Sequence, residues 1–229
     1  MTGPPDAAGA GFPHGARVLI VDDHPLIRQG VARTLSAEPG LEVAGEAATA
    51  AEALAQASEL EPDLVVLDLG LGSADGLDLI PRILRATGGA KVLVLSMFDE
   101  ALYAERCLRA GASGYLMKEA ASSTLVDAIR EVLAGEIHVS EPVQDRLVRK
   151  AAGRAPDSAG VSDLTDRELQ VFRMLGEGLS TREVAEGLHL SIKTVESHRA
   201  KIMRKLGLEQ ASQLIHRAVA WVQGEHGMP

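Results

Sequence analysis

The chain has 229 residues, of which 46% are hydrophobic, and a formal net charge of −9. This length and composition suit one or two globular domains and exclude a chain that is disordered throughout. No signal-peptide pattern opens the sequence, no apolar run approaches the roughly 18 residues of a membrane helix, and the single cysteine excludes an intramolecular disulfide framework. We therefore expect a cytoplasmic protein.

The charge is divided unevenly along the chain. Residues 162–229 hold nine basic and nine acidic side chains, so residues 1–161 carry the whole excess of −9. This asymmetry predicts two parts with different functions.

The first part shows an alternation of short β-rich runs and helical patterns. Residues 1–15 are rich in Gly, Pro and Ala, which predicts a disordered leader before a first domain over 16–138. The predicted strands are 17–21, 41–47, 63–68, 91–96 and 114–118. The predicted helices are 25–37, 49–60, 76–86, 100–110 and 122–134. Three strands are apolar almost throughout, which is typical of a parallel sheet covered on both faces. The predicted fold is an α/β doubly wound domain with a five-stranded parallel sheet.

The second part reads as a helical domain after a linker. Residues 139–161 contain a possible short helix, 142–150, followed by the flexible stretch AAGRAPDSAG. In 162–229, Thr165 with Glu168 and Ser180 with Glu183 fit the capping box that begins a helix. Ser191 can cap a third helix, about 192–206. A short helix, a tight turn and a longer helix predict a helix-turn-helix.

Polar side chains stand at the carboxyl ends of the predicted strands, where ligands gather in an open parallel sheet. These residues are Asp22, Asp23, Asp68, Ser96 and Lys118. Clustered carboxylates favour a hard cation such as Mg²⁺. Beside that ion, Asp68 is a candidate nucleophile toward a phosphoryl group, with Lys118 as a second positive charge and Ser96 as a hydrogen-bond partner. Taken singly, an aspartate at a strand end is more often a helix cap or a turn residue.

Residues 17–135 resemble the receiver domain of bacterial two-component response regulators, which has a flavodoxin-like fold. The matching pieces are VDDHP, VVLDLGLGSADGLDLI, LSMFDE and GYLMK. The resemblance implies that Asp68 takes a phosphoryl group from a phosphohistidine of a sensor kinase. It also implies that Asp23, Asp68 and the backbone carbonyl of Gly70 hold Mg²⁺ with help from Asp22. Ser96 and Tyr115 are implied to form a switch, in which Tyr115 turns inward; the alternative for Tyr115 is a half-buried strand residue.

The sequence departs from the receiver pattern at two positions. Gly72 replaces a common Pro, which loosens the loop after Asp68, and Glu119 replaces the frequent Pro after Lys118. Neither change removes a chemical group from the predicted site.

The stretch SIKTVESHRAKIMRKLGL carries five Lys or Arg and one acid, Glu196. As the second helix of a helix-turn-helix, it occupies the position of a recognition helix in the major groove. Residues 164–208 resemble the LuxR/NarL-type DNA-binding domain through LTDRE, GLSTREVAEGL and KTVESHRAKIMRKLGL. We predict the following DNA-binding residues: Lys193, Thr194, Glu196, Ser197, Arg199, Ala200, Lys201, Arg204 and Lys205. Glu196 either accepts a hydrogen bond from cytosine N4, or pairs with Lys193 or Arg199 on the same helix, or makes a contact outside the groove.

These features together predict a DNA-binding response regulator that regulates transcription. Its expected cofactor is Mg²⁺, and its expected partners are a sensor histidine kinase, double-stranded DNA and a second copy of the chain. One alternative is a DNA-binding regulator controlled by a partner protein without phosphorylation. An Asp-nucleophile phosphatase is the alternative of another class, but such enzymes need a second acid two residues after the nucleophile, and Gly70 stands there. We therefore do not expect an enzyme.

Overall fold

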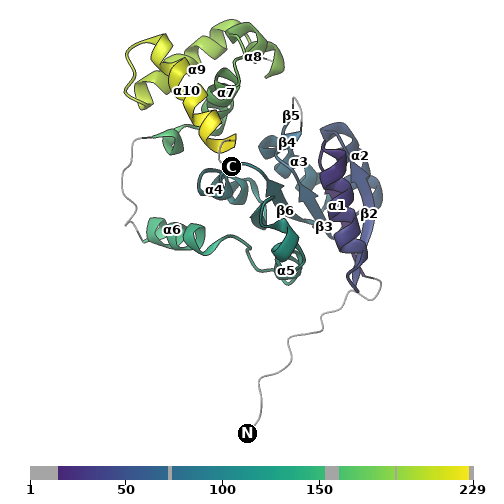
Figure 1. Cartoon of the computed structure of the whole chain (residues 1–229). Helices are drawn as coiled ribbons and strands as arrows, with labels where there is room; N and C mark the ends of the chain where they lie inside the picture. Colours follow the sequence, from purple (N-terminus) through teal and green to yellow (C-terminus); the bar gives the residue numbers. More distant parts are fainter. Residues whose placement is uncertain (1–14, 72–73, 153–159, 189, 227–229) are drawn as a thin grey trace. The chain divides into compact units, whose positions relative to one another are not determined.

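A computed structural model describes residues 15–71, 74–152, 160–188 and 190–226. The predicted leader 1–15, except for its last residue Gly15, lies outside these residues, as do Gly72 and most of the stretch 151–160. The chain divides into two compact units, Met1–Ala151 and Ala152–Pro229 (Figure 1). Within the described residues, no helix is both long enough and apolar enough to cross a membrane.

The first unit is built on a five-stranded parallel sheet of order β2-β1-β3-β6-β7. The strands are β1 (Ala16–Val21), β2 (Leu41–Ala47), β3 (Leu64–Leu67), β6 (Lys91–Ser96) and β7 (Gly114–Met117). The predicted parallel sheet is confirmed, and each predicted strand agrees with the structure to within one residue at either end. The central strands β3 and β6 are buried almost throughout, which explains their nearly continuous apolar sequence.

Helices cover both faces of this sheet (Figure 1). They are α1 (Pro25–Ser36), α2 (Ala50–Leu60), α3 (Gly76–Thr87), α4 (Glu100–Ala110) and α5 (Ala121–Leu133). Helices α1 and α5 pack on one face against alternate strand residues such as Val18, Ile20 and Val66. On the opposite face, α3 lies between α2 and α4 and packs against both. This arrangement leaves the carboxyl edge of the sheet free for a site.

Strand β2 contains an irregularity that the sequence did not indicate. Val18 of β1 pairs with Val43, but the next residue, Leu19, pairs with Gly45, so Ala44 is an extra residue in β2. An extra residue of this kind reverses which face of the sheet the following side chains point to. The residues of β2 after Ala44 are therefore turned over relative to a regular strand.

A second feature without a sequence signal is a small hairpin that follows Asp68. Strands β4 (Gly70–Leu71) and β5 (Ala74–Asp75) pair in antiparallel fashion. Helix α3 begins directly afterwards at Gly76, where a Cβ atom would lie 2.4 Å from the Cα atom of Leu69. The backbone therefore packs more closely here than any other residue type would permit.

The segment after α5 stays attached to the first unit. His138 forms a parallel bridge with Gly114, and its carbonyl oxygen accepts a hydrogen bond from the backbone N–H of Tyr115 at 2.8 Å. This bridge extends the sheet beyond β7. It also fixes the start of helix α6 (Glu141–Ala151), which corresponds to the short helix predicted at 142–150.

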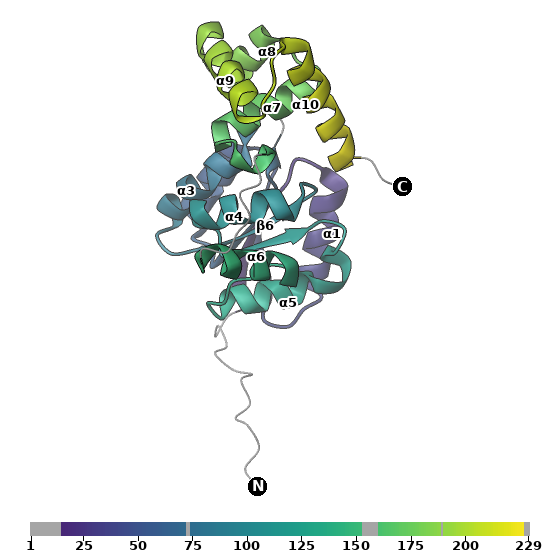
Figure 2. The same ribbon diagram turned by 90° about the vertical axis from the view of Figure 1, so that its left-hand side faces the viewer.

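Helix α6 packs beside α4, as Figure 2 shows. Val143 is buried at 3% exposure. The backbone N–H of Ser140 donates to Glu100 Oε1 at 2.7 Å, and Lys150 Nζ lies 2.6 Å from Glu105 Oε1. The first part of the predicted linker thus contains a helix that is anchored to the first unit by apolar and polar contacts.

The second unit consists of a short 3₁₀ helix, η1 (Val161–Asp163), and four α-helices. These are α7 (Asp166–Gly176), α8 (Thr181–Gly187), α9 (Ile192–Lys205) and α10 (Ala211–His226). Both predicted capping boxes are present, because Thr165 with Glu168 and Ser180 with Glu183 exchange hydrogen bonds. Ser191 accepts a hydrogen bond from the N–H of Thr194 at the start of α9. The predicted helix-turn-helix is thus confirmed as α8 and α9.

The core of the second unit lies between α7, α9 and α10. Its largest buried side chain is Phe172, whose ring centroid lies 5.5 Å from that of Trp221 in α10. Val195 and Ile202, two turns apart on α9, are fully buried. Because these two side chains face inward, the opposite face of α9 is turned to solvent.

Candidate functional site: an acidic pocket and an exposed basic helix

The carboxyl edge of the sheet gathers three aspartates. Asp22 and Asp23 follow β1, and Asp68 follows β3. Carboxylate oxygens of all three, with a ring nitrogen of His24, lie within 4.8 Å of one another. Asp22 and Asp68 are buried, whereas Asp23 is half-buried. Three carboxylates in one place supply the hard oxygen ligands that Mg²⁺ prefers, so the donor set fits this ion.

Lys118 forms ion pairs with two of these carboxylates. Its Nζ lies 2.7 Å from Asp22 Oδ2 and 2.8 Å from Asp68 Oδ2, and all three side chains are 5% exposed. The ammonium is therefore the direct counter-ion of the predicted nucleophile. Lys118 follows directly after β7, and its backbone N–H donates a hydrogen bond to the carbonyl oxygen of Ser96 at 2.9 Å. This bond fixes the start of the lysine side chain at the carboxyl edge of the sheet.

The pocket shifts the pKa of its groups in ways that follow from burial and charge. Burial raises the pKa of Asp68, and the nearby Lys118 opposes this shift without reversing it. For Lys118, burial alone would lower the pKa, but the two carboxylates outweigh it and raise the pKa. The lysine is therefore held in its charged form.

Ser96 and Tyr115 both lie inside the unit. Each is 1% exposed. The hydroxyl of Tyr115 donates to the carbonyl oxygen of Phe98 at 2.7 Å, and the N–H of Phe98 donates to Ser96 Oγ at 3.3 Å. The ring of Phe98 stacks on Tyr103 of α4 at a centroid distance of 5.0 Å. The tyrosine that was expected to turn inward on phosphorylation is already inside.

Gly70 lies next to Asp68 at the start of the small hairpin. A Cβ atom built on Gly70 would stand 3.5 Å from Asp68 Oδ2. The absence of a side chain leaves room beside the carboxylate. It also means that this position offers no general acid, as the sequence indicated.

On helix α9, six of the nine predicted DNA-binding residues are exposed: Lys193, Glu196, Ser197, Ala200, Lys201 and Arg204. Their spacing of three and four residues places them on one face of the helix. This face is opposite Val195 and Ile202 and carries three cations and one carboxylate. A basic, exposed helix face of this kind is what a recognition helix needs in order to contact a DNA groove.

The other three predicted DNA-binding residues have partners within the second unit. Arg199 donates to Thr181 Oγ1 of α8. Lys205 Nζ lies 2.6 Å from Glu168 Oε2, and Glu168 is only 3% exposed. The hydroxyl groups of Thr194 and Ser191 are 2.8 Å apart. The sequence pattern could not separate these residues from the exposed ones, because their partners come from α7, α8 and the helix cap.

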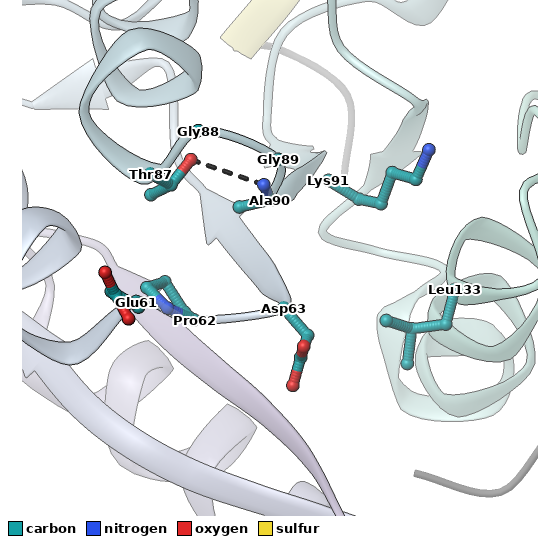
Figure 3. A pocket seen from close by; sticks show the side chains of 9 residues that line it. All are labelled: Glu61, Pro62, Asp63, Thr87, Gly88, Gly89, Ala90, Lys91 and Leu133. Atoms are coloured by element: carbon teal, nitrogen blue, oxygen red, sulfur yellow. Dashed lines mark hydrogen bonds between the residues drawn. The ribbon is translucent and has the colours of Figure 1, made fainter.

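A separate hollow lies at the opposite, amino-terminal edge of the sheet (Figure 3). It has a volume of about 320 Å³ and contains none of the predicted site residues. Its lining residues are Glu61, Pro62, Asp63, Thr87, Gly88, Gly89, Ala90, Lys91 and Leu133. The acidic pocket at the carboxyl edge is thus the place where the predicted chemical groups meet.

Family models match both units. The response regulator receiver domain matches residues 18–130, and the luxR family of bacterial regulatory proteins matches residues 162–218. The chain is 35% identical over 209 residues to the oxygen regulatory protein NreC of Staphylococcus aureus (strain bovine RF122 / ET3-1), covering 89% of this chain and 96% of NreC. It is 34% identical over 199 residues to the transcriptional regulatory protein LiaR of Bacillus subtilis (strain 168), covering 86% and 93%.

A solved structure of a response regulator is also similar to this chain over both units. RcsB from Salmonella enterica serovar Typhimurium, bound to promoter rprA in the presence of the phosphomimetic BeF₃⁻, matches with a TM-score of 0.69 and 27% identity. That match covers 90% of this chain and 98% of the RcsB chain. Because the similarity runs through both units and nearly the full length of these relatives, the chain belongs to the two-component response regulators that join a receiver domain to a LuxR-type DNA-binding domain.

Proposed function

We propose that Asp68 is the phosphoacceptor of this response regulator and that its phosphorylation controls binding to DNA. The observation that carries the proposal is the position of Asp68 at the end of β3. Its carboxylate lies beside those of Asp22 and Asp23, and its Oδ2 atom is 2.8 Å from Lys118 Nζ. A sensor histidine kinase is the phosphoryl donor. Since regulation of transcription takes place on chromosomal DNA, the protein works in the cytoplasm.

Asp68 is the nucleophile of the transfer. Its carboxylate oxygen forms a bond to phosphorus while the bond from phosphorus to the donor's histidine nitrogen breaks, and that nitrogen keeps the electron pair. Asp23, Asp68 and the carbonyl of Gly70 would hold Mg²⁺ with help from Asp22, and the ion, when bound, would neutralise charge on the phosphoryl oxygens. Lys118 supplies a second positive charge to the same oxygens.

The switch residues connect this pocket to α4. In the proposed transition, Ser96 Oγ hydrogen-bonds a phosphoryl oxygen and gives up the N–H of Phe98, which it accepts at 3.3 Å. The carbonyl of Phe98 is also the acceptor of the Tyr115 hydroxyl. A shift of this one peptide segment therefore affects both Tyr115 and the ring stacked on Tyr103.

Helix α9 is the proposed recognition helix. Lys193, Lys201 and Arg204 contact phosphates, while Glu196, Ser197 and Ala200 lie between them and face the bases. Glu196 either accepts a hydrogen bond from cytosine N4 or pairs with a neighbouring cation. Each chain presents one recognition helix, so a dimer on two half-sites provides the specificity.

Phosphoryl uptake tests the assignment of Asp68. Asp68→Asn should abolish acid-labile phosphate uptake from acetyl phosphate and Mg²⁺, because the amide is no nucleophile. Asp78→Asn, which removes an exposed carboxylate from the first turn of α3, is the matched control and should label like the wild type. Persistent labelling of Asp68→Asn would refute the proposal.

One observation favours a second candidate, a regulator that binds DNA without phosphorylation. Tyr115 already occupies the inward position, with its hydroxyl bonded to Phe98. DNA affinity with and without BeF₃⁻ and Mg²⁺ separates the two candidates. A large increase supports phosphorylation control, whereas equal affinity supports the second candidate.

The domain assignment follows from the same proposal. We take the receiver as residues 16–138 and the DNA-binding domain as 162–229, with α6 as the part of the connection that is docked on α4. The protein itself is a phosphoryl acceptor with no further reaction of its own, since Gly70 lacks the acid that a phosphatase would need.

A further inference from the structure

Arg28, in the first turn of α1, reaches back to the loop that carries the acidic pair. Its Nη1 donates to the backbone carbonyl oxygen of Asp22 at 2.7 Å. Its Nε donates to Glu46 Oε2 in β2 at 3.1 Å, and the Arg28 side chain is 18% exposed. The guanidinium thus ties together the loop, a helix and the edge strand of the sheet.

The irregularity in β2 gives Glu46 its direction. After the extra residue Ala44, Glu46 pairs with Ile20 of β1, whose side chain packs on the α1 side of the sheet. Paired residues in a parallel sheet point to the same face, so Glu46 also points toward α1. Without the extra residue, the same carboxylate would point to the opposite face. The bulge therefore brings the acceptor to Arg28.

The carbonyl that Arg28 holds belongs to the first residue of the acidic pair. Asp22 accepts the N–H of His24 at Oδ1, at 2.8 Å, and Lys118 at Oδ2, at 2.7 Å. Asp23 follows directly in the chain. A contact that fixes the Asp22 peptide therefore fixes the direction of both carboxylates.

We propose that Arg28, aimed by Glu46, is a positioning residue that holds the Asp22–Asp23 loop in the geometry that binds Mg²⁺. This inference rests on the proposed function, because it deals with the same site. Arg28 acts through the backbone and contacts neither the metal nor the phosphoryl group. Partners that orient metal ligands typically contribute 10–100-fold to metal affinity.

Charge and positioning predict opposite results when Arg28 is replaced. Its positive charge repels a cation in the pocket, and Glu46 offsets that repulsion only in part. If charge were the whole effect, Arg28→Met would bind Mg²⁺ more tightly. If Arg28 positions the loop, the same variant binds Mg²⁺ more weakly in spite of the lost repulsion.

Calorimetric titration of the full-length protein with MgCl₂ distinguishes the charge effect of Arg28 from its positioning effect. We expect Arg28→Met to raise the Kd for Mg²⁺ about tenfold. Arg28→Lys keeps the charge and one donor and should fall between Arg28→Met and the wild type. Arg33→Met removes the same charge from an exposed site on the same helix and should leave the Kd nearly unchanged. Equal or tighter binding by Arg28→Met overturns the inference.

Glu46→Gln tests whether Glu46 orients the Arg28 side chain. It also replaces Arg28→Met as the test if a thermal melt shows that Arg28→Met does not fold. It weakens the anchor for Arg28 and leaves the guanidinium charge uncompensated, so it should also raise the Kd. An unchanged Kd overturns the role of Glu46. If the wild-type protein binds no Mg²⁺, the proposed function itself is contradicted. If the wild type binds Mg²⁺ but the variants bind it equally well, only the present inference fails.

Discussion

Replacing Lys118 by Met tests the electrostatic account of the pocket. The change keeps most of the side-chain volume but removes the only counter-ion that lies within 3 Å of both Asp22 and Asp68 among the described residues. The two carboxylates are 5% exposed. The variant therefore leaves buried charge without its cation.

The size of the effect follows from that burial. Breaking a buried ion pair by removing one partner costs about 3–5 kcal/mol, because the remaining charge stays uncompensated. We expect the lower end, about 3 kcal/mol, since Asp68 can relieve part of the cost by binding a proton, at about 1.4 kcal/mol per pKa unit. At about 3 °C per kcal/mol, the melting temperature of the first unit should fall by roughly 10 °C.

The pH dependence has a definite sign. The pKa of Asp68 is raised in the folded protein, so the folded state binds more protons and stability falls as pH rises above the unfolded value of about 4. Without Lys118 the pKa of Asp68 in the folded protein rises further. The loss of stability that accompanies ionisation of Asp68 therefore continues to a higher pH. The difference in unfolding free energy between wild type and Lys118→Met should therefore be largest near about pH 8 and shrink toward about pH 5. The pKa of Lys118 is also raised, but this lysine is charged in both states throughout that range.

Thermal unfolding followed by circular dichroism measures the loss. Trp221 is the only tryptophan and belongs to the second unit, so its fluorescence should report an unchanged transition. Lys150→Met breaks an ion pair whose lysine is 55% exposed and should cost at most about 1 kcal/mol. A loss under about 1 kcal/mol for Lys118→Met, or a difference that grows on acidification, would refute the reasoning.

Three further predictions concern other parts of the chain. Glu196→Ala should relax the preference for one base pair in a DNA-binding selection; uniformly tighter binding with the same preference would contradict base reading. Gly176→Ala should destabilise the second unit by about 1–3 kcal/mol, seen by Trp221 fluorescence, because the new Cβ would lie 2.4 Å from the carbonyl oxygen of Ala218. Val143→Ala should loosen α6 by about 2 kcal/mol and speed amide exchange there, since Val143 is 3% exposed; unchanged exchange would show that the polar contacts suffice.

Much of the fold and of the candidate site could be predicted from the sequence. The alternation of apolar runs and helical patterns is a local property, and parallel strands all end at the same edge. The sequence therefore predicts that Asp22, Asp68 and Lys118 lie close together. The caps at Thr165 and Ser180 are equally local, because each involves residues three positions apart.

The tertiary structure alone decided the features that depend on register and on contacts between distant segments. One extra residue in β2 turns Glu46 toward Arg28, and no sequence pattern indicates it. The burial of Tyr115 and the packing of α6 on α4 depend on how helices meet the edge of the sheet. The sequence by itself determined which chemical groups meet at the carboxyl edge, because periodicity identifies the buried strands and the carboxyl ends of parallel strands share one edge. Only the folded chain decided how they are held, because a side chain's partner across the fold is set by packing and register rather than by its neighbours in sequence.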